Sequence, residues 1–495
     1  MSSSKSSVKQ NTKVSFKPVA PFQLFYQLTY MSAMASAGIT RSKLFELAAT
    51  SPSKAAVYFA AINTLVDEFR YDYPEACRMI GVKAKSNNMR SFLLRLSDAL
   101  RSGEPMPDFL AREAEAQGED YENRYERDLE SLKQWSNAFS SIVISVALII
   151  IIQVISSMIQ TLNIGMITGL IVTGVMMSGL GAWIIYRSAP AEILTVKPSE
   201  GSQEQKRAMR WFRILFPLGT VAAVLLNLLG VHLGIILIML AAVMLPVGIM
   251  SMLSDRITNK KDEEISTFLR SSGGMATASG STLKQALTKI DLSSFPTLEK
   301  DIDRLSKRLQ ALVDPEICWH KFGLESGSKL ISEVIDIFYG AIKIGGDPER
   351  VGYLCSLFAA KTAQLRAKRR LIAGTFSGLS TVMHGVVAGL MVFVLSIVTN
   401  FTEMVTSMMP QSDAAAEGQR SVNMGLTSIT PADLQFLAAI TVVMVLLLAI
   451  VSAAAIIFTD GGYKLKVNLY MALDVFISGV SFIVVPPMVM GILRG

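Results

Sequence analysis

The sequence predicts an all-α polytopic membrane protein with about seven transmembrane helices and two repeated cytoplasmic helical-bundle domains. Of its 495 residues, 51% are hydrophobic and 18% are charged, whereas soluble globular chains carry about 25% charged residues. The apolar residues gather in windows long enough to cross a hydrocarbon core, which takes about 20 helical residues. The two long polar segments show helical periodicity and almost no strand alternation.

Seven windows have the required length and apolarity, and Arg213 is the one Lys or Arg inside any of them. The first and second windows, like the third and fourth, are joined by only a few residues, so each pair is expected to form a membrane hairpin. The windows lie at 138–160, 164–186, 211–230, 234–253, 371–397, 434–458 and 471–491.

The distribution of basic residues predicts the orientation in the cell membrane. The chain has 47 Lys and Arg against 40 Asp and Glu. If residues 1–137 lie inside, only Arg420 and Arg494 fall on the outer side, as the positive-inside rule requires. We therefore expect a cytoplasmic N-terminus and an external C-terminus. The basic residues form no soluble module of the kind that binds nucleic acid, so no nucleic-acid partner is expected.

This reading gives an expected domain organisation. Residues 1–21 form a basic tail that lacks the apolar core of a signal peptide and is expected to be disordered. The remaining parts are a first cytoplasmic helical domain (22–137), a membrane hairpin (138–186), a cytoplasmic loop (187–210), a second hairpin (211–253), a second cytoplasmic helical domain (254–370), a membrane helix (371–397), an external loop (398–433) and two membrane helices (434–491).

Two short motifs recur at one spacing and predict an internal duplication. Gly38-Ile39-Thr40 corresponds to Gly280-Ser281-Thr282, and the ALRSG motif ending at Gly103 corresponds to the AIKIG motif ending at Gly345, with the same offset for both motifs. Shared spacing of separate motifs is the signature of a repeat. We expect the four glycines to make fold-defining turns, with each threonine capping the helix that follows.

No catalytic, metal or cofactor site is evident. The GLESGSK segment at 323–329 lacks the spacing of a phosphate-binding loop, and the three His and three Cys show no metal-ligand spacing. Transporters concentrate ionisable groups inside the membrane, and here Asp474 is the one carboxylate that falls within a window. The sequence therefore predicts neither an enzyme nor a cofactor.

A basic run from Lys361 to Arg370 directly precedes the fifth window. Such a run can anchor the chain at lipid phosphates, or it can form a docking patch for a cytoplasmic partner. Both interpretations can hold together.

The duplicated helical domain resembles the type II secretion F family. The resemblance rests on the glycine turn near its start, the later Arg/Lys-x-Gly element and the following membrane helix. Members of that family form the inner-membrane platforms of type IV pilus-like machines. The stretch at 322–370 is most similar to platforms of the archaellum, the archaeal flagellum, whereas bacterial pilus platforms are shorter and have three spans.

The resemblance implies a non-enzymatic role. A hexameric secretion ATPase in the cytoplasm would act on the platform, which would move pilin-like or archaellin subunits from the membrane into a filament. It also implies contact with membrane lipids and a homodimer. The alternatives are the platform of an archaeal adhesion pilus, a polytopic transporter and a membrane enzyme. The candidate ATPase-docking residues are Lys343, Asp347, Glu349, Arg350, Arg366, Lys368, Arg369 and Arg370.

Overall fold

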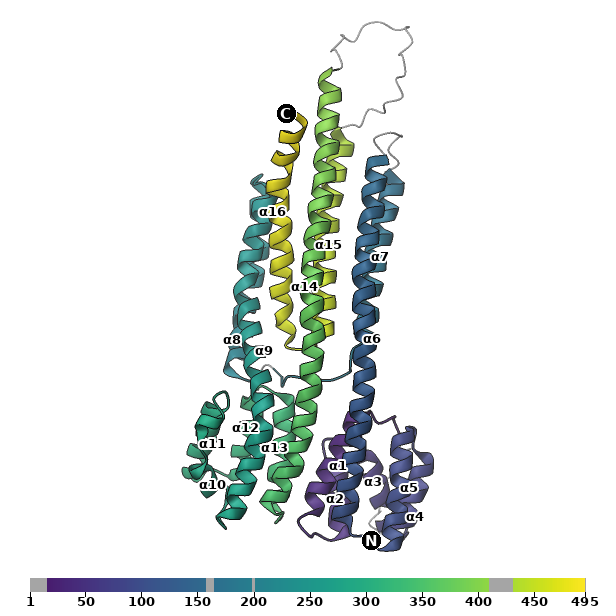
Figure 1. Ribbon diagram of the computed structural model, residues 1–495, viewed down its shortest axis with the longest axis vertical. Coiled ribbons are helices and arrows are strands. Elements are labelled where there is room, and N and C mark those ends of the chain that lie inside the picture. Colours follow the sequence, from purple (N-terminus) through teal and green to yellow (C-terminus); the bar gives the residue numbers. More distant parts are fainter. Residues whose placement is uncertain (1–15, 157–163, 198–200, 409–430, 495) are drawn as a thin grey trace, which may run out of the picture. The chain divides into compact units, whose positions relative to one another are not determined.

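The computed structural model describes residues 16–156, 164–197, 201–408 and 431–494, and the regular secondary structure within them is helical (Figure 1). An isolated β-bridge joins Thr195 and Ser328. The all-α prediction is thereby confirmed. Most of the expected basic tail and most of the expected external loop lie outside the described residues.

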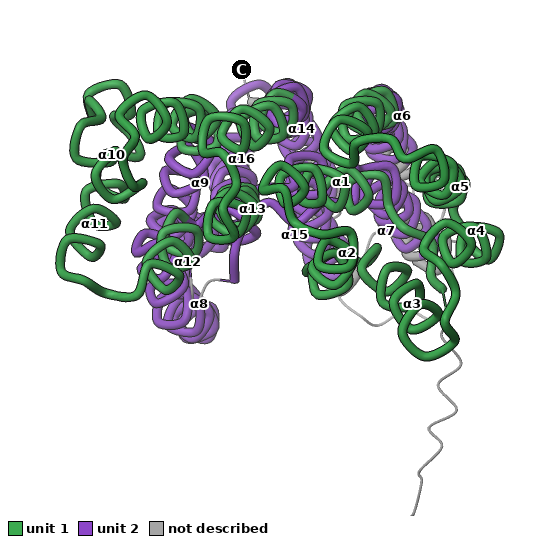
Figure 2. The backbone as a smooth tube through the Cα atoms, turned by 90° about the horizontal axis from the view of Figure 1, so that it is seen from below, with its two compact units in different colours: residues 1–124, 261–326, 330–364 green, residues 125–260, 327–329, 365–495 purple. Residues whose placement is uncertain are grey.

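The chain divides into two compact units (Figure 2). Unit 1 contains residues 1–124, 261–326 and 330–364, and unit 2 contains 125–260, 327–329 and 365–495. Within unit 1, we call the residues up to 124 the first repeat and the other two segments the second repeat.

Each repeat is built from short helices followed by the start of a long one. The first repeat contains α1 (Pro21–Ala35), α2 (Arg41–Thr50), α3 (Ala56–Asp67), α4 (Tyr73–Lys83), α5 (Asn87–Ser102) and the start of α6 (Met106–Ser156). The second repeat contains the end of α9 (Leu233–Ala278), α10 (Leu283–Lys289), the 3-10 turn η1 (Leu292–Ser294), α11 (Glu299–Gln310), α12 (Pro315–Glu325), α13 (Lys329–Lys343) and the start of α14 (Pro348–Met408).

The helix bounds show the duplication directly. The offset that separates the sequence motifs also separates both ends of α4 and α12, the first residues of α2 and α10, and the first residues of α6 and α14. Positive φ recurs in the same register: φ is 69° at Gly38 and 55° at Gly280, 77° at Gly103 and 99° at Gly345, and 60° at Arg70 and 61° at Leu312. The two repeats therefore share one backbone path, including a left-handed turn that is made without glycine.

The helix caps agree with the expected pattern in part. The Thr40 side chain accepts a hydrogen bond from the Lys43 backbone N–H at 3.3 Å, whereas Thr282 stands at the N-cap of α10 without a side-chain bond. Asp72 and Asp314, at equivalent positions of the duplication, cap α4 and α12 by accepting from the backbone. Asx residues at this position satisfy N–H groups that the helix leaves unbonded.

Aromatic side chains fill the core of both repeats and join them. Phe45, Phe59 and Phe92 are buried in the first repeat. Phe25 of α1 packs against Phe358 of α14, with ring centroids 4.8 Å apart. Burial of such rings supplies much of the packing energy of a small helical bundle, so the repeats form one unit.

Unit 2 contains the apolar helices. They include α7 (Ile164–Ser188), α8 (Gln203–Leu228), α15 (Pro431–Asp460) and α16 (Val467–Arg494). Five helices of the described residues are long and apolar enough to cross a membrane: Gln203–Leu228, Leu233–Ala278, Pro348–Met404, Leu434–Asp460 and Lys464–Ile492. They correspond to the third to seventh expected windows.

The first two expected windows fall in α6 and α7, and the window at 138–160 runs into residues outside the described ranges. The expected hairpin turn at 161–163 lies there too. The helix that contains the fifth window is longer than expected, because α14 continues beyond residue 397 to Met408. The chain is thus a polytopic helical membrane protein, and seven spans remain a prediction.

Four helices share the apolar core of unit 2. The buried residues are contributed by α9, α14, α15 and α16, and α15 also packs against α7. The core residues are Leu237, Ala241, Val392, Ala449, Val475 and Phe482.

Candidate functional site: a charged seam and a buried polar junction

Oppositely charged residues join α6 and α14. In unit 1, Arg350 pairs with Asp108 at 2.8 Å and Lys361 pairs with Glu122 at 3.1 Å. In unit 2, Lys368 pairs with Glu126. We call these three pairs the charged seam. Every acid of the seam is on α6 and every base is on α14.

Two pairs of the seam join equivalent positions of the duplication, namely Asp108 with Arg350 and Glu126 with Lys368. From Asp108 to Glu126 the helix makes about five turns, at about 3.6 residues per turn, and so returns to the same face. The long helices therefore run in the same direction with corresponding faces toward each other. Partly exposed pairs like these each contribute about 0.2–1 kcal/mol.

A buried ion pair lies in unit 2, next to the last pair of the seam. The Arg366 Nη2 donates to Glu192 Oε1 at 2.5 Å, and the two side chains are 2% and 5% exposed. Glu192 belongs to the connection between α7 and α8. The Tyr125 hydroxyl lies 3.5 Å from the same carboxylate, and burial together with the Glu192 charge raises the pKa of Tyr125. The ion pair fixes α14 to that connection.

Arg369 anchors α14 to the end of α15. Its buried guanidinium donates to the backbone oxygens of Thr459 at 2.9 Å, Phe458 at 3.0 Å and Pro190 at 3.1 Å. The last carbonyls of a helix have no partner within the helix, so Arg369 caps α15. Gly461, which directly follows α15, has φ of 71°, and a Cβ there would collide with the guanidinium. Glycine at 461 is what lets the guanidinium approach.

Lys466 completes this arrangement at the start of α16. Its ammonium lies 3.1 Å from Asp255 of α9 and 2.9 Å from Asp460 at the end of α15, and all three residues are buried. Asp255 also accepts from the Tyr463 N–H at 3.2 Å. Buried charges persist only when they are paired and hydrogen-bonded. We call the following residues the polar junction: Glu192, Arg366, Arg369, Asp255, Asp460 and Lys466.

The polar junction corrects part of the sequence-based expectation for ATPase docking. Arg366 and Arg369 are 2% and 3% exposed, so the expectation that they lie on a docking surface is wrong. A run of cations in the sequence does not reveal partners that are distant along the chain. Glu192 is far from Arg366 in the sequence, and no local signal marked it.

The other candidate docking residues have structural partners or lie at the surface. Lys343 pairs with Glu316 at 2.6 Å. The Asp347 carboxylate caps α14, because it accepts from the Arg350 backbone N–H at 3.1 Å, and it also accepts from the Thr277 hydroxyl at 3.2 Å. Both Arg350 and Lys368 belong to the charged seam. Glu349 is exposed on the first turn of α14, and Arg370 is half-buried.

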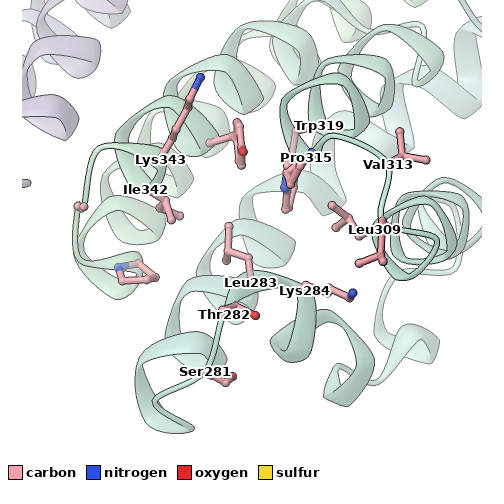
Figure 3. A pocket seen from close by; sticks show the side chains of 15 residues that line it. Ser281, Thr282, Leu283, Lys284, Leu309, Val313, Pro315, Trp319, Ile342 and Lys343 are labelled. Carbon is pink, nitrogen blue, oxygen red and sulfur yellow. The ribbon is translucent and has the colours of Figure 1, made fainter.

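An apolar groove opens beside Lys343 in the second repeat (Figure 3). It encloses about 530 Å³ and is lined by Leu309, Leu312 and Trp319, among others, with Lys284 also in its wall. Leu312 is 83% exposed and occupies the left-handed conformation described above. The groove is therefore an accessible apolar surface with basic residues at its edge.

The apolar side chains that line the groove are not repeated at the equivalent positions of the first repeat. The first repeat has Asp67 and Arg70 where the second has Leu309 and Leu312. Charged residues at these positions cannot make an equally apolar wall. The duplicated fold thus presents different surfaces to a partner on its two halves.

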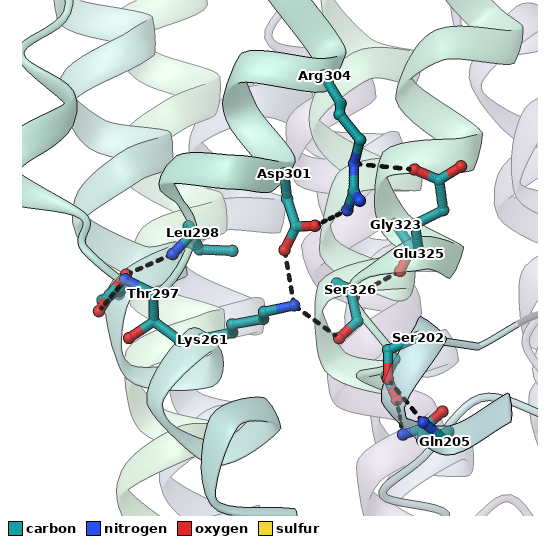
Figure 4. Close-up of polar contacts among 12 residues, drawn as sticks. Ser202, Gln205, Lys261, Thr297, Leu298, Asp301, Arg304, Gly323, Glu325 and Ser326 are labelled. Atoms are coloured by element: carbon teal, nitrogen blue, oxygen red, sulfur yellow. Dashed lines mark hydrogen bonds and ion pairs between the residues drawn. The ribbon is translucent and has the colours of Figure 1, made fainter. Parts of the chain in front are cut away.

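A network of ion pairs links α11 and α12, which contribute residues to the groove, to each other and to α9 (Figure 4). Buried Lys261 of α9 pairs with Asp301 of α11 at 2.7 Å. Glu325 of α12 pairs with Arg308 at 2.7 Å and with Arg304 at 3.6 Å. Helices α9, α11 and α12 are linked in this way, so the groove is carried on a fixed frame.

The described residues offer little for chemistry. They contain no group of three or more His, Cys, Asp or Glu side chains placed to hold a metal ion. The cysteines Cys77, Cys318 and Cys355 are buried and free. Among polar residues in the apolar helices, the His384 Nε2 lies 2.9 Å from the Ser478 hydroxyl, and Asp474 is fully buried.

Comparison with known proteins agrees with this architecture. The family model described as type II secretion system protein F matches residues 28–154, which cover most of the first repeat and α6. Over these residues the chain is similar to the type II secretion system F family. Two relatives are each named flagella accessory protein J, one from Methanocaldococcus jannaschii and one from Methanococcus voltae.

The first relative is 27% identical over 340 residues, covering 66% of this chain and 60% of the relative. This chain thus spans less than two thirds of that relative's length. The second is 22% identical over 434 residues, covering 86% of this chain and 76% of the relative. No solved structure matches this chain.

Proposed function

We propose that this protein is the membrane platform of a type IV pilus-like assembly machine, most directly the archaellum. In this role it couples a cytoplasmic hexameric ATPase to the insertion of filament subunits and to filament motion. The observation that carries the proposal is the pair of long helices. Each of α6 and α14, with 51 and 61 residues, begins in a polar repeat and continues into an apolar window.

The contacts of these helices suit mechanical coupling. The charged seam holds α6 and α14 in one register, and the polar junction fixes α14 to α15 and to the α7–α8 connection. A movement of α14 is therefore passed to both of these elements. Packed elements of this kind move as rigid bodies rather than deform continuously.

The groove of the second repeat is the best surface for the ATPase. It combines exposed apolar side chains with Lys284 and Lys343, and exposed Glu349 lies close by in the sequence. An apolar centre with a polar rim is typical of protein interfaces. With the N-terminus in the cytoplasm and the C-terminus outside, this surface faces the motor, and a homodimer would present two such grooves.

A deletion strain tests the proposed function. Loss of the gene should abolish surface filaments while filament subunits accumulate in the membrane. Motility lost together with the filaments supports the archaellum, whereas retained motility with lost surface adhesion supports the adhesion-pilus alternative. Normal filaments in this strain would end the proposal.

A point variant tests the docking surface. Leu312→Glu places a charge in the apolar groove, and we expect binding of the ATPase to weaken about tenfold or more, because an uncompensated buried charge costs several kcal/mol. The matched control is Arg70→Glu at the equivalent position of the first repeat, which should bind as the parent does. Equal binding by both variants would exclude the groove.

The transporter alternative depends on Asp474, whose two carboxylate oxygens lack a hydrogen-bond partner within the described residues. Buried ionisable groups in membranes often mark ion paths. If the protein is a platform, Asp474→Asn should assemble filaments at the parental level. Loss of filaments in this variant, with the protein present in the membrane, would favour ion coupling.

A further inference from the structure

Four cations on the first turns of α8 have no carboxylate partner among the described residues. Lys206, Arg207, Arg210 and Arg213 are all exposed, and none lies in an ion pair with a described residue. They follow one another at spacings of one to three residues, which places them on one broad helix face. Glu204 is the acidic residue of the first turn.

The basic run that directly precedes α14's apolar window is different. There Lys361, Arg366 and Lys368 are neutralised by acidic residues of the same chain, namely Glu122, Glu192 and Glu126. The sequence indicates that this run is a lipid anchor, a docking patch or both, but much of its positive charge is already paired within the chain. In the described part of the chain, α8 instead keeps four adjacent cations without carboxylate partners.

The rest of α8 is exposed and apolar. Only 6% of its most hydrophobic window is buried, compared with 28% to 50% for the other four candidate spans. Its exposed side chains beyond the basic turns are large: Ile214, Phe216, Leu218, Val221, Val224, Leu225 and Leu228.

The residue types on that face indicate lipid rather than a partner helix. Helices that associate in membranes use small residues at the contact, and the small residue Gly219 is already turned toward α9, where a Cβ would lie 2.8 Å from Val243. Trp211, which is 49% exposed, lies between Arg210 and Arg213, directly before the apolar part of α8. Trp at this position is typical of the membrane–water boundary.

We propose that Lys206, Arg207, Arg210 and Arg213 form a binding site for the phosphodiester headgroups of anionic phospholipids. The four cations stand at headgroup level when the apolar face of α8 lies in the hydrocarbon. Clustered juxtamembrane cations attract anionic lipid, and arginine donates two parallel hydrogen bonds to a phosphate. The site does not depend on the proposed platform function.

The test is lipid selectivity of the full-length protein in vesicles. In a Trp135→Phe, Trp183→Phe background, quenching by brominated phosphatidylglycerol and by brominated phosphatidylcholine reports on Trp211, because Trp319 is buried in unit 1. We expect phosphatidylglycerol to bind about threefold more tightly or better. The measured quantity is the ratio of the apparent affinity for phosphatidylglycerol to that for phosphatidylcholine. Changing all four cations to Gln should bring this ratio close to one.

The matched control removes four exposed cations of unit 1 and so changes the net charge by the same amount as the α8 variant. Its substitutions are Arg41→Gln, Lys54→Gln, Lys289→Gln and Lys300→Gln. It should keep the parental ratio. Equal quenching by the two lipids in the parent, or an unchanged ratio in the α8 variant, would overturn the proposal. If the fourfold α8 variant does not fold, the single variant Arg210→Gln should still lower the ratio.

Two further arms separate lipid from other anions. Because the attraction is electrostatic and the site is exposed, raising NaCl from about 0.05 to 0.5 M should reduce the ratio. Millimolar inorganic phosphate at constant ionic strength should leave it unchanged. If inorganic phosphate abolishes the preference, the site binds free phosphate and the lipid proposal is wrong.

Discussion

Gly103 and Gly345 end equivalent helices with φ of 77° and 99°, and an added Cβ would meet no atom within 4 Å at either residue. Substitution by Ala therefore carries only the conformational cost of the left-handed region. We expect Gly103→Ala and Gly345→Ala each to lower the free energy of unfolding by about 1–2 kcal/mol. Denaturant unfolding in detergent measures this change.

Gly274 of α9 is the control for these two variants, because it is helical and also has open space around an added methyl group. Gly274→Ala should raise stability by about 0.5–1 kcal/mol. A destabilisation of the same size at all three glycines would show that the left-handed conformation is not the cause.

The buried Arg366–Glu192 pair should respond very differently to single and double substitution. Glu192→Leu removes the carboxylate that pairs with the buried Arg366 guanidinium and should cost about 3–5 kcal/mol of stability. Arg366→Met with Glu192→Leu removes both charges and should cost less than the sum of the single changes. A double-mutant cycle on unfolding free energies measures the coupling.

The exposed Lys43–Glu46 pair, at 2.8 Å, serves as the control for that cycle. It should couple by less than about 0.5 kcal/mol. Equal coupling in the two cycles would mean that burial adds nothing to the polar junction.

Some residue roles were readable in the sequence and some were not. The glycine turns were readable, because few other residues adopt positive φ. Arg70 and Leu312 adopt the same conformation without any compositional signal. The partners of Arg366 and Arg369 are set by tertiary contacts, so the sequence pattern wrongly predicted that both residues are exposed.

At the scale of the helix, the charged seam should tolerate exchange of its charges. Glu126→Lys places two ammonium groups together across α6 and α14 and should lower the thermal unfolding midpoint. Lys368→Glu in the same chain restores the pair with its polarity reversed and should recover most of the loss. A double variant no more stable than Glu126→Lys alone would show that the seam does not hold the helices.

Hydropathy located the apolar windows but not the length of the helices that contain them. The helices α6 and α14 have 51 and 61 residues, and the windows at 138–160 and 371–397 cover less than half of each. The polar part of each helix, which precedes the window, is amphipathic. A hydropathy window leaves this polar part out, although it belongs to the same helix. The sequence predicts that each repeat runs into a membrane helix, and the structure adds that α6 and α14 continue without a break from the polar part to the apolar part.

For the whole molecule, the predicted topology can be tested by cysteine labelling. Leu229, in the turn between α8 and α9, should lie outside, and Lys289, in the second repeat, should lie in the cytoplasm. A membrane-impermeant maleimide should label Leu229→Cys in intact cells and Lys289→Cys only after lysis. The native thiols are buried, and burial raises the pKa of Cys77, so background labelling should be low. The reverse pattern would invert the predicted orientation.

The charged seam also indicates the order of two evolutionary events, the duplication of the repeat and the appearance of opposite charges at equivalent positions. If the two repeats descend from one gene whose product paired with itself, residues on the symmetry axis of that ancestor met identical copies of themselves. Asp108 opposite Arg350 and Glu126 opposite Lys368 are impossible in such an ancestor. These opposite charges must then have arisen after the ancestral gene was duplicated and the two copies could differ. Because one long helix now carries the acids and the other carries the bases, each repeat pairs with the other repeat and no longer with a copy of itself.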